Sequence, residues 1–166
     1  MIKDQNSINR IRQEKSGLTA RFFFQVLPIK KIKMEHRIKT LEQILLNDRF
    51  EGSNDIHLVS LGKGEEVAEM IVAEKHLNGV NIIHGGALFT LADFAFAAAS
   101  NSHGRIAVAA NATISFFKGV SSGKLKAKAR EHSSGKMLST YIVEITDEEE
   151  NKIALFSGTA FMKGEY

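Results

Sequence analysis

The sequence contains no cysteine, and this absence removes several kinds of chemistry at once. Without thiols the chain has no disulfide framework, no thiolate nucleophile and no zinc site built from cysteine. Long apolar runs are also absent, since none approaches the roughly 18 to 20 residues that a membrane helix needs. At 166 residues and 43% hydrophobic side chains, the chain can still form a proper core. We expect a soluble, cytoplasmic protein.

Common catalytic and metal-binding motifs are missing as well. The sequence has no GxSxG elbow and no glycine-rich phosphate loop, which counts against a serine hydrolase and against nucleotide chemistry. The histidines other than His84 show neither HxH nor HxxxH spacing and no clustered acidic partners, so neither a metal nor another cofactor is expected. We interpret the acidic run from Asp147 to Glu150 as a solvated hairpin tip.

Positive charge is concentrated near the N-terminus. Residues 1–33 carry eight basic and two acidic side chains, a net charge of +6, so residues 34–166 carry −3 of the total of +3. The body therefore lacks the basic face that nucleic-acid binding requires. We interpret residues 1–33 as a basic N-terminal extension of unknown role: a transit peptide, a nucleic-acid or membrane-surface arm, or an upstream extension with Met34 as the true start. Residues 34–166 are expected to form one domain.

Apolar periodicity predicts the secondary structure of this domain. Apolar residues at steps of three and four after Glu35 predict a short amphipathic helix, which Asn47, Asp48 and Gly52 end. The run ALFTLADFAFAAAS predicts a long apolar helix. Strands are predicted at residues 56–61 and 66–73 before that helix, and after it at residues 105–118, 123–132, 137–146 and 152–162, as a meander.

The long helix decides the fold class. Because it is hydrophobic nearly all round, it must be covered on most sides, which a single curved sheet can do. We therefore predict an α+β hotdog fold, in which a curved antiparallel sheet wraps around one long central helix. An open α+β sandwich would leave more of the helix exposed.

One charged residue lies inside this apolar helix. Asp93 is surrounded by leucine, phenylalanine and alanine, with nothing in the helix that could pair with it. Aspartate is rarely buried without a partner, and apolar surroundings raise its pKa, so Asp93 is a candidate catalytic carboxylate. The structural alternative is that Asp93 lies on a narrow exposed stripe or accepts hydrogen bonds from a neighbouring strand.

The residues His84, Gly85 and Gly86 mark the point where a loop becomes the helix. Free N–H groups at a helix N-terminus attract negative charge, and here they could form an oxyanion hole for a substrate carbonyl. An ordinary glycine-rich helix entry is the structural alternative. By itself, His84 is more often a structural or capping histidine than a catalyst.

The spacing of these two features predicts quaternary structure. Eight helical residues at about 1.5 Å each separate Gly85 from Asp93 by roughly 12 Å. One carbonyl cannot contact both, because a base and an oxyanion donor must each lie within about 3 Å of the atoms they serve. If both act on one substrate, they come from different subunits. The spacing therefore predicts a dimer with active sites at its interface.

Residues 78–104, NGVNIIHGGALFTLADFAFAAASNSHG, resemble the PaaI-type (phenylacetic acid degradation) thioesterases of the hotdog superfamily. The shared pattern is Asn, then HGG, then F-x-LAD and a small-residue helix ending in NS-x-G. ALFSGTAF at residues 154–161 resembles the last strand of that family. The resemblance extends from about Glu35 to the end of the chain. It implies hydrolysis of acyl-CoA thioesters, often with aryl or medium-chain acyl groups, by a dimer of dimers.

The resemblance also implies roles for individual residues. Asp93 would be the general base or the nucleophile, and the Gly85 amide would polarise the thioester carbonyl. His84 and Asn78 would position substrate or water. The substrate and its CoA moiety would be held by Gly86, Phe117, Lys118, Gly119, Ser134, Gly135 and Lys136.

Two positions depart from the family pattern. Ala109 stands where some relatives carry a serine that helps the attacking water, so that role has no residue here. Gly119 stands where the family often has proline, which loosens the expected turn on the CoA side.

Two other functions remain open at this point. A non-catalytic acyl-CoA-binding hotdog regulator would use the basic N-terminal arm to bind DNA, although the arm lacks a clear helix-turn-helix. A dehydratase or hydratase of the same fold usually pairs a histidine with a carboxylate in another motif, so the HGG to LAD spacing argues against it. We expect an acyl-CoA thioesterase that needs no metal, cofactor or membrane, and that is a homodimer or a homotetramer.

Overall fold

The structure is a computed structural model, and it describes residues 40–45, 47–62 and 65–165. The basic extension at residues 1–33 and the alternative start at Met34 lie outside the described residues. Residues 40–45 are helical, and two further α-helices follow, α2 (Arg49–Ser53) and α3 (Gly85–Asn101). A short 3-10 helix spans Glu74–His76. Within the described part, no helix is long and apolar enough to cross a membrane.

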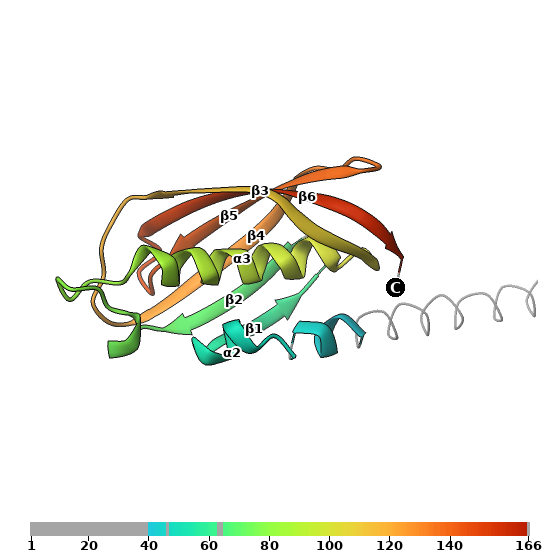
Figure 1. Cartoon of the computed structure of the whole chain (residues 1–166). Helices are drawn as coiled ribbons and strands as arrows, with labels where there is room; N and C mark the ends of the chain where they lie inside the picture. The colour runs from blue at the N-terminus through green and yellow to red at the C-terminus, as the bar shows by residue number, and fades with distance from the viewer. Residues whose placement is uncertain (1–39, 46, 63–64, 166) are drawn as a thin grey trace, which may run out of the picture. The chain divides into compact units, whose positions relative to one another are not determined.

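Six strands form one antiparallel sheet that curves over α3 (Figure 1). Residues 40–45 and α2 lie on the other side of α3, away from the middle of the sheet (Figure 1). The order across the sheet is β1-β2-β4-β5-β6-β3. The strands are β1 (Ile56–Leu61), β2 (Glu65–Ile71), β3 (Arg105–Phe116), β4 (Lys124–Ser133), β5 (Leu138–Thr146) and β6 (Lys152–Glu165).

The core lies between α3 and the concave face of the sheet. Along β4, buried Leu125, Ala127 and Ala129 alternate with lysines and an arginine, because successive side chains of a strand point to opposite faces. On α3, Phe96 is fully buried and packs edge-on against Tyr141 of β5, with ring centroids 5.6 Å apart. The predicted hotdog arrangement, a curved antiparallel sheet around one long helix, is confirmed.

The predicted four-strand meander is wrong at β3. Strands β4, β5 and β6 follow one another in the sheet, but β3 pairs with β6 and forms the far edge. The Asn101 side chain fixes the start of β3, since its Oδ1 accepts a hydrogen bond from the Ala107 N–H at 2.9 Å and its amide donates to the Ala107 carbonyl at 3.3 Å. Alternation along a strand identifies its buried face but carries no information about its neighbours.

Local boundaries also differ from the prediction. The first helix ends before Asn47 and Asp48 as predicted, but Asp48 also begins α2, because its Oδ1 accepts a hydrogen bond from the Phe50 N–H at 3.0 Å. Gly52, also predicted to end the first helix, lies inside α2. The 3-10 helix was not predicted at all. The strand predicted at 66–73 ends at Ile71, and the one predicted at 105–118 ends at Phe116, which leaves Lys118 in a loop. The last strand extends three residues beyond its predicted end.

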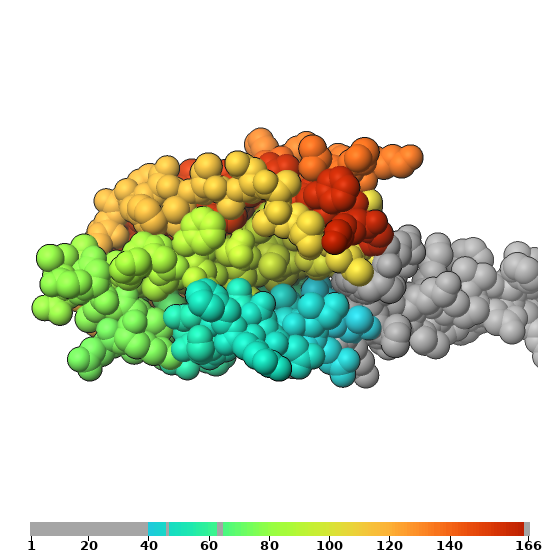
Figure 2. Space-filling model, in the orientation of Figure 1, coloured from blue at the N-terminus to red at the C-terminus, as the bar shows by residue number. Residues whose placement is uncertain are grey.

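Strands β1 and β3 form the two edges of the sheet, and neither pairs with a further strand among the described residues; β3 is the longer. Ile106 and Val108 on β3 are 41% and 43% exposed, which is unusual for large aliphatic side chains on a regular strand. Figure 2 shows the yellow β3 and the yellow-green α3 uncovered together on one face, above the teal α2. An apolar strand edge and the flank of the central helix therefore share one accessible surface.

Candidate active site

Asp93 lies in the middle of α3 and is half-buried. Among the described residues, its carboxyl group has no hydrogen-bond or ion-pair partner. Burial raises the pKa of Asp93 above its ordinary value, and the negative charge of Asp48 raises it further. Once ionised, a carboxylate with a raised pKa is a stronger base than a solvated one, so it accepts a proton from an attacking water more readily than an ordinary aspartate does.

Two further carboxyl groups stand near Asp93, and both come from the α2 segment. Glu51 interacts electrostatically with Asp93, and its pKa is raised to about 7, chiefly by burial and then by a hydrogen bond with Asp48. The same hydrogen bond lowers the pKa of Asp48. Glu51 therefore stays protonated and donates a hydrogen bond to the ionised Asp48, over a range of pH where both carboxyl groups would otherwise be ionised.

Sequence reasoning missed both of these carboxyl groups. A signal was present, since Asp48 and Glu51 stand three residues apart at the N-cap and N3 positions of α2, which is the spacing of a capping box. That signal predicts the start of a helix. It does not indicate that the helix lies against Asp93, more than forty residues further along the chain.

The N-terminus of α3 is capped by His84. Its Nδ1 accepts a hydrogen bond from the Gly86 N–H at 2.8 Å. Because Nδ1 is an acceptor here, the ring is neutral and carries its proton on Nε2. The Gly86 amide is thereby used in the cap, whereas the Gly85 N–H has no hydrogen-bond partner in the part of the chain that the structure describes. Gly85 is thus the available donor at this helix end.

Both glycines stand at close contacts with aromatic rings. A Cβ atom at Gly85 would lie 3.0 Å from Cζ of Phe116, and one at Gly86 would lie 2.9 Å from Nδ1 of His84. The first contact means that the aromatic ring at the end of β3 covers the helix N-terminus. Any larger residue at Gly85 must displace that ring.

Asn78 shapes the loop that leads to His84. Its Oδ1 accepts hydrogen bonds from the N–H groups of Val80 at 3.0 Å and Ile82 at 3.3 Å. Its own N–H donates to the Ile82 carbonyl at 2.8 Å. The side-chain oxygen is therefore occupied in holding the loop, and the amide nitrogen is the atom left for contact with water or substrate.

Part of the predicted CoA-binding set lines a cavity with Gly85. Gly85 and Phe116 are joined there by Phe117, Lys118 and Gly119, in a space of about 420 Å³. These residues come from the N-terminus of α3 and from the loop after β3. The remaining lining residues are Ile82, Ile83 and Leu88.

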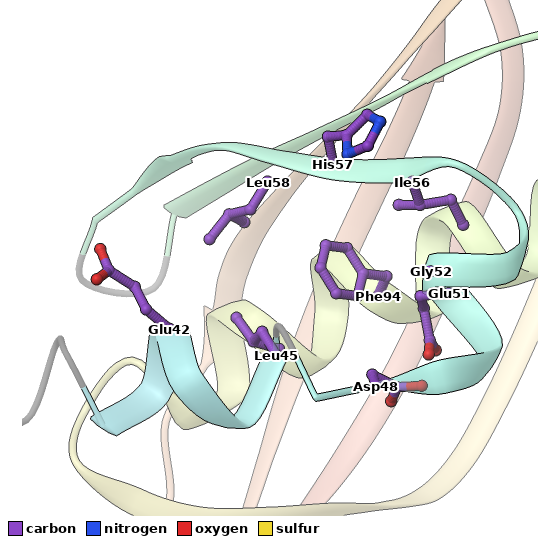
Figure 3. Close-up of a pocket in the computed structure, with 9 residues that line it drawn as sticks. All are labelled: Glu42, Leu45, Asp48, Glu51, Gly52, Ile56, His57, Leu58 and Phe94. Carbon is purple, nitrogen blue, oxygen red and sulfur yellow. The ribbon is translucent and has the colours of Figure 1, made fainter.

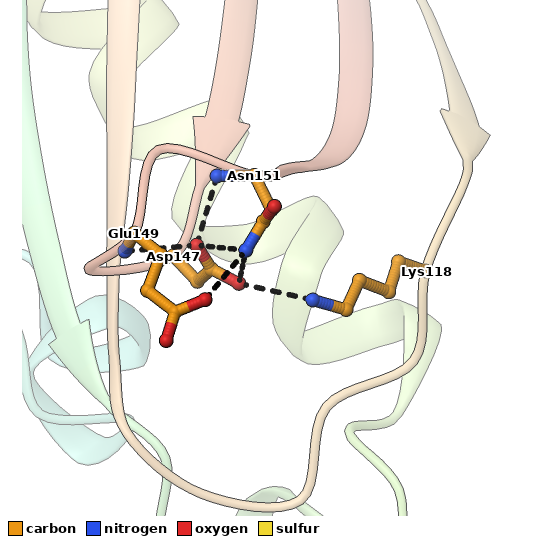
Figure 4. Close-up of polar contacts among 4 residues, drawn as sticks. All are labelled: Lys118, Asp147, Glu149 and Asn151. Atoms are coloured by element: carbon orange, nitrogen blue, oxygen red, sulfur yellow. Dashed lines mark hydrogen bonds and ion pairs between the residues drawn. The ribbon is translucent and has the colours of Figure 1, made fainter.

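Lys118 is fixed at this cavity by the β5–β6 hairpin. Its Nζ lies 3.3 Å from Oδ2 of Asp147, and Oδ1 of Asp147 accepts hydrogen bonds from the N–H groups of Glu149 and Asn151 (Figure 4). Hydrogen bonds from Asn151 are the main cause that holds the pKa of Asp147 below its ordinary value. The predicted solvated hairpin tip is thus also an anchor for the loop that contains Lys118.

The other part of the predicted CoA-binding set lies elsewhere. Ser134, Gly135 and Lys136 form the β4–β5 turn, and Arg105 at the start of β3 donates a hydrogen bond to the Lys136 carbonyl at 2.9 Å. Lys118 follows the end of β3. A twelve-residue strand is roughly 36 Å long, so one chain does not bring the two parts together.

Three sequence interpretations concern groups outside this region. His103 was expected to lack an acidic partner, but its Nε2 lies 2.7 Å from Oε2 of Glu131, which also accepts a hydrogen bond from Tyr141 at 3.1 Å. The described ranges contain no cluster of three or more acidic or histidine side chains that could hold a metal ion. Ala109 lies in β3 opposite Ala160, so this position supplies no hydroxyl group.

Comparisons with known proteins agree with this arrangement. A family model, the Thioesterase superfamily, matches residues 80–154. The acyl-coenzyme A thioesterase PaaI of Escherichia coli is 39% identical over 119 residues, which are 71% of this chain and 85% of that protein. The solved structure of E. coli PaaI matches with a TM-score of 0.74 at 35% identity, covering 78% of this chain and 94% of that one.

A Streptococcus mutans protein solved with bound acetyl CoA is 28% identical, with a TM-score of 0.65, and the match covers 67% of this chain and 90% of that one. The identity and coverage of the E. coli relative are high enough to assign the family. The chain belongs to the thioesterase superfamily, as a hotdog protein of the PaaI type. It is a thioester hydrolase, and the predicted family and enzyme class are confirmed.

Proposed function

We propose that this protein hydrolyses acyl-CoA thioesters with aryl or medium-chain acyl groups, releasing the free acid and CoA. The observation that carries the proposal is the pairing, on one helix, of a half-buried carboxyl at Asp93 with an unoccupied N–H at Gly85. The substrate class is supported by two relatives, the E. coli acyl-coenzyme A thioesterase and the S. mutans protein with bound acetyl CoA. A cytoplasmic location, where acyl-CoA is available, is part of the same proposal.

The chemistry follows from these two groups. The Gly85 N–H, reinforced by the positive end of the α3 dipole, donates to the thioester oxygen as negative charge develops on it. Such a donor contributes about 2.7 to 4 kcal/mol in other acyl-transfer enzymes. Asp93 either takes a proton from water, which attacks the carbonyl, or attacks the carbonyl itself to form a mixed anhydride, which water hydrolyses, after the thiolate has left, to release the free acid and restore the carboxylate. The thiolate of CoA then leaves without needing a strong acid.

The CoA moiety is assigned to two regions. Lys118, at the mouth of the cavity beside Gly85, provides a positive charge for a phosphate group, and Phe117 and Gly119 line the same cavity. The turn with Gly135 and Lys136 provides a second basic region near the start of β3. In an antiparallel pairing of two β3 edges, the end of one strand lies beside the start of the other, so both regions could bind one CoA across the dimer.

A homodimer completes the site in this proposal. Gly85 and Asp93 are roughly 12 Å apart along α3, so each substrate takes Gly85 from one subunit and Asp93 from the other. The β3 edge and the flank of α3 form the surface that would pair (Figure 2). A second apolar row, Val108, Phe161 and Leu138, runs across β3, β6 and β5 on the convex face and supports a dimer of dimers.

A hydrolysis panel tests the activity directly. Purified protein is assayed against acetyl-, hexanoyl-, palmitoyl-, benzoyl- and phenylacetyl-CoA, with thiol release as the readout and Asp93→Asn as the matched control. We expect the highest kcat/KM with the aromatic and six-carbon substrates. No thiol release from any of the five substrates would contradict the proposed function.

A further inference from the structure

A second cavity, of about 410 Å³, lies beside α3 on its α2 side (Figure 3). Neither the sequence patterns nor the proposed chemistry uses it. It is formed by the helical residues 40–45, by α2, by β1 and by one residue of α3. Its lining residues are Glu42, Leu45, Asp48, Glu51, Gly52, Ile56, His57, Leu58 and Phe94.

Most of the cavity surface is apolar. Leu45, Leu58 and Phe94 converge on the same space from three different elements, and Ile56 closes it from β1 (Figure 3). Phe94 and Ile56 are buried, at 5% exposure each. A cavity of this size and composition suits a small apolar group, such as a ring or a short alkyl chain.

The polar part of the wall is acidic. The carboxyl groups of Asp48 and Glu51 stand side by side at one end, and Glu42 stands at the other (Figure 3). The described lining residues include no lysine or arginine. The His57 ring points to the opposite side of β1 from Leu58, so it does not face the acidic wall from within the described lining (Figure 3).

The cavity adjoins the carboxyl group that the proposed reaction uses. Phe94 follows Asp93 directly on α3, and both Asp48 and Glu51 interact electrostatically with Asp93. Asp93 itself does not line the cavity, but a thioester carbonyl within about 3 Å of the reacting water or of Asp93 would lie close to the cavity wall formed by Phe94, Asp48 and Glu51. The CoA-side cavity at Lys118 lies at the N-terminal end of α3, near Gly85, whereas the second cavity contacts α3 near its middle, at Phe94.

We propose that the cavity between α2, β1 and α3 is the acyl-group pocket, and that its carboxyl wall at Asp48 and Glu51 excludes acyl groups that end in a carboxylate. This inference rests on the proposed function, because it assigns a pocket to the acyl part of the same substrate. It predicts that uncharged acyl groups are substrates and that dicarboxylic ones are rejected.

The exclusion follows from electrostatics in a partly apolar space. A carboxylate at the far end of a six-carbon chain would have to enter beside Asp48 and Glu51, which together carry at least one negative charge at neutral pH. Repulsion between like charges a few ångströms apart at a protein surface corresponds to a discrimination of about tenfold to several hundredfold. Among the described lining residues, no lysine or arginine is present to offset it.

Two substrates with the same number of acyl carbons test whether the carboxyl wall repels a terminal carboxylate. Hexanoyl-CoA and adipoyl-CoA differ in whether the chain ends in a methyl group or a carboxylate. For the wild type, we expect kcat/KM for hexanoyl-CoA to exceed that for adipoyl-CoA by about a hundredfold. In the double variant Asp48→Asn and Glu51→Gln, the ratio should fall at least about tenfold. Asparagine caps a helix as well as aspartate, so α2 is retained.

The ratio of the two substrates separates specificity from a general loss of activity. As a matched control, Glu150→Gln removes one negative charge at an exposed position on the β5–β6 hairpin and should leave the ratio unchanged. A wild-type ratio near one, or a ratio that the double variant does not change, would overturn the inference while hexanoyl-CoA hydrolysis still upholds the proposed function. No hydrolysis of either acyl-CoA would overturn both.

A second variant tests the pocket by its volume and involves no charge. Leu58→Phe places a larger ring in the cavity from the inward face of β1. We expect the preferred straight-chain substrate to become shorter by about two carbons, with little change for acetyl-CoA, because the phenylalanine side chain exceeds that of leucine by the volume of roughly two or three methylene groups. An unchanged chain-length profile would show that the acyl group binds elsewhere.

Discussion

The Asp93 carboxyl occupies a half-buried position on α3 and has no hydrogen-bond partner among the described residues. A buried polar group without a partner typically costs about 1 to 3 kcal/mol of stability. The nearby Asp48 carboxylate adds to this cost by raising the pKa of Asp93. A half-buried carboxyl group with a raised pKa and no hydrogen-bond partner among the described residues is more readily explained by a chemical role than by a structural one.

Replacing this carboxyl tests that role. Asp93→Asn should lower kcat for acyl-CoA hydrolysis by at least about a hundredfold, because a general base contributes roughly 10²- to 10⁴-fold. The amide has nearly the same shape, so the midpoint of thermal unfolding should stay the same or rise slightly. Circular dichroism and thiol release on the same preparation give both quantities. Near-normal turnover in this variant would rule out the proposed role of Asp93.

The neighbours of Asp93 predict a pH effect. A base must be deprotonated to act, so activity falls as the pH drops through the raised pKa of Asp93. In the variant Asp48→Asn with Glu51→Gln, no like charge is left on α2, and the pKa of Asp93 should fall. The acid limb of the kcat/KM profile with hexanoyl-CoA should therefore move to lower pH. An acid limb at the wild-type position would show that these carboxyl groups do not affect the catalytic base.

Sequence reasoning found Asp93 but missed its acidic neighbours, for a physical reason. The contrast between a carboxylate and an apolar helix is local, so it can be read along the chain. The approach of Asp48 and Glu51 depends on how α2 packs against α3, which is a tertiary contact. Charges that tune a site usually come from other elements, and a single sequence carries little information about them.

At the scale of elements, the N-terminus of α3 predicts a capping role for His84, separate from the proposed oxyanion role of Gly85. His84→Ala removes the acceptor for the Gly86 N–H, and loss of an N-cap typically costs about 0.5 to 2 kcal/mol. His84→Asn supplies a new side-chain acceptor and should recover most of that stability. Chemical denaturation measures both variants. If His84 acts only as a cap, kcat should recover with Asn as well; loss of kcat in both variants would indicate direct contact with substrate.

The β5–β6 hairpin predicts a pH-dependent contribution to stability. Asp147 has a folded-state pKa below its ordinary value, so its contribution is complete above the ordinary aspartate pKa of about 3.9 and is lost as pH falls through the lowered value. Asp147→Ala should therefore lower the thermal midpoint at pH 7 but make a smaller difference near pH 3. An equal difference at both pH values would mean that the carboxylate charge is not what stabilises the hairpin.

Secondary structure was largely predictable, whereas the order of strands was not. Alternation of Leu125, Ala127 and Ala129 with charged residues identifies β4 and its buried face from the sequence alone. The pairing of β3 with β6, in contrast, depends on a contact between residues about fifty positions apart, such as Val108 with Phe161. The fold class could still be inferred, because a helix that is apolar nearly all round leaves few ways to cover it.

At the scale of the whole molecule, the free β3 edge and the spacing on α3 point to the same assembly. A long exposed strand with apolar side chains such as Val108 tends to pair with another strand. The Gly85 and Asp93 groups, roughly 12 Å apart, cannot act on one carbonyl within a chain. Pairing of two β3 edges would solve both problems, since it covers the strand and brings a second α3 to each site.

Mixed dimers test this arrangement. Asp93→Asn and Gly85→Val should each be nearly inactive alone, the second because a side chain at position 85 collides with the Phe116 ring beside the oxyanion donor. When the two variants are unfolded together and refolded, half of the dimers are mixed. If sites are shared, each mixed dimer has one intact site, with Gly85 from one chain and Asp93 from the other.

Activity should then return to about one quarter of the wild-type value per chain, because one of two sites is intact in half of the dimers. The control is each variant refolded alone, which should stay inactive. If each site belonged to a single chain, no mixed dimer would contain a complete one, and mixing would restore nothing. Recovery on mixing therefore distinguishes a shared site from two independent ones without requiring a structure of the complex.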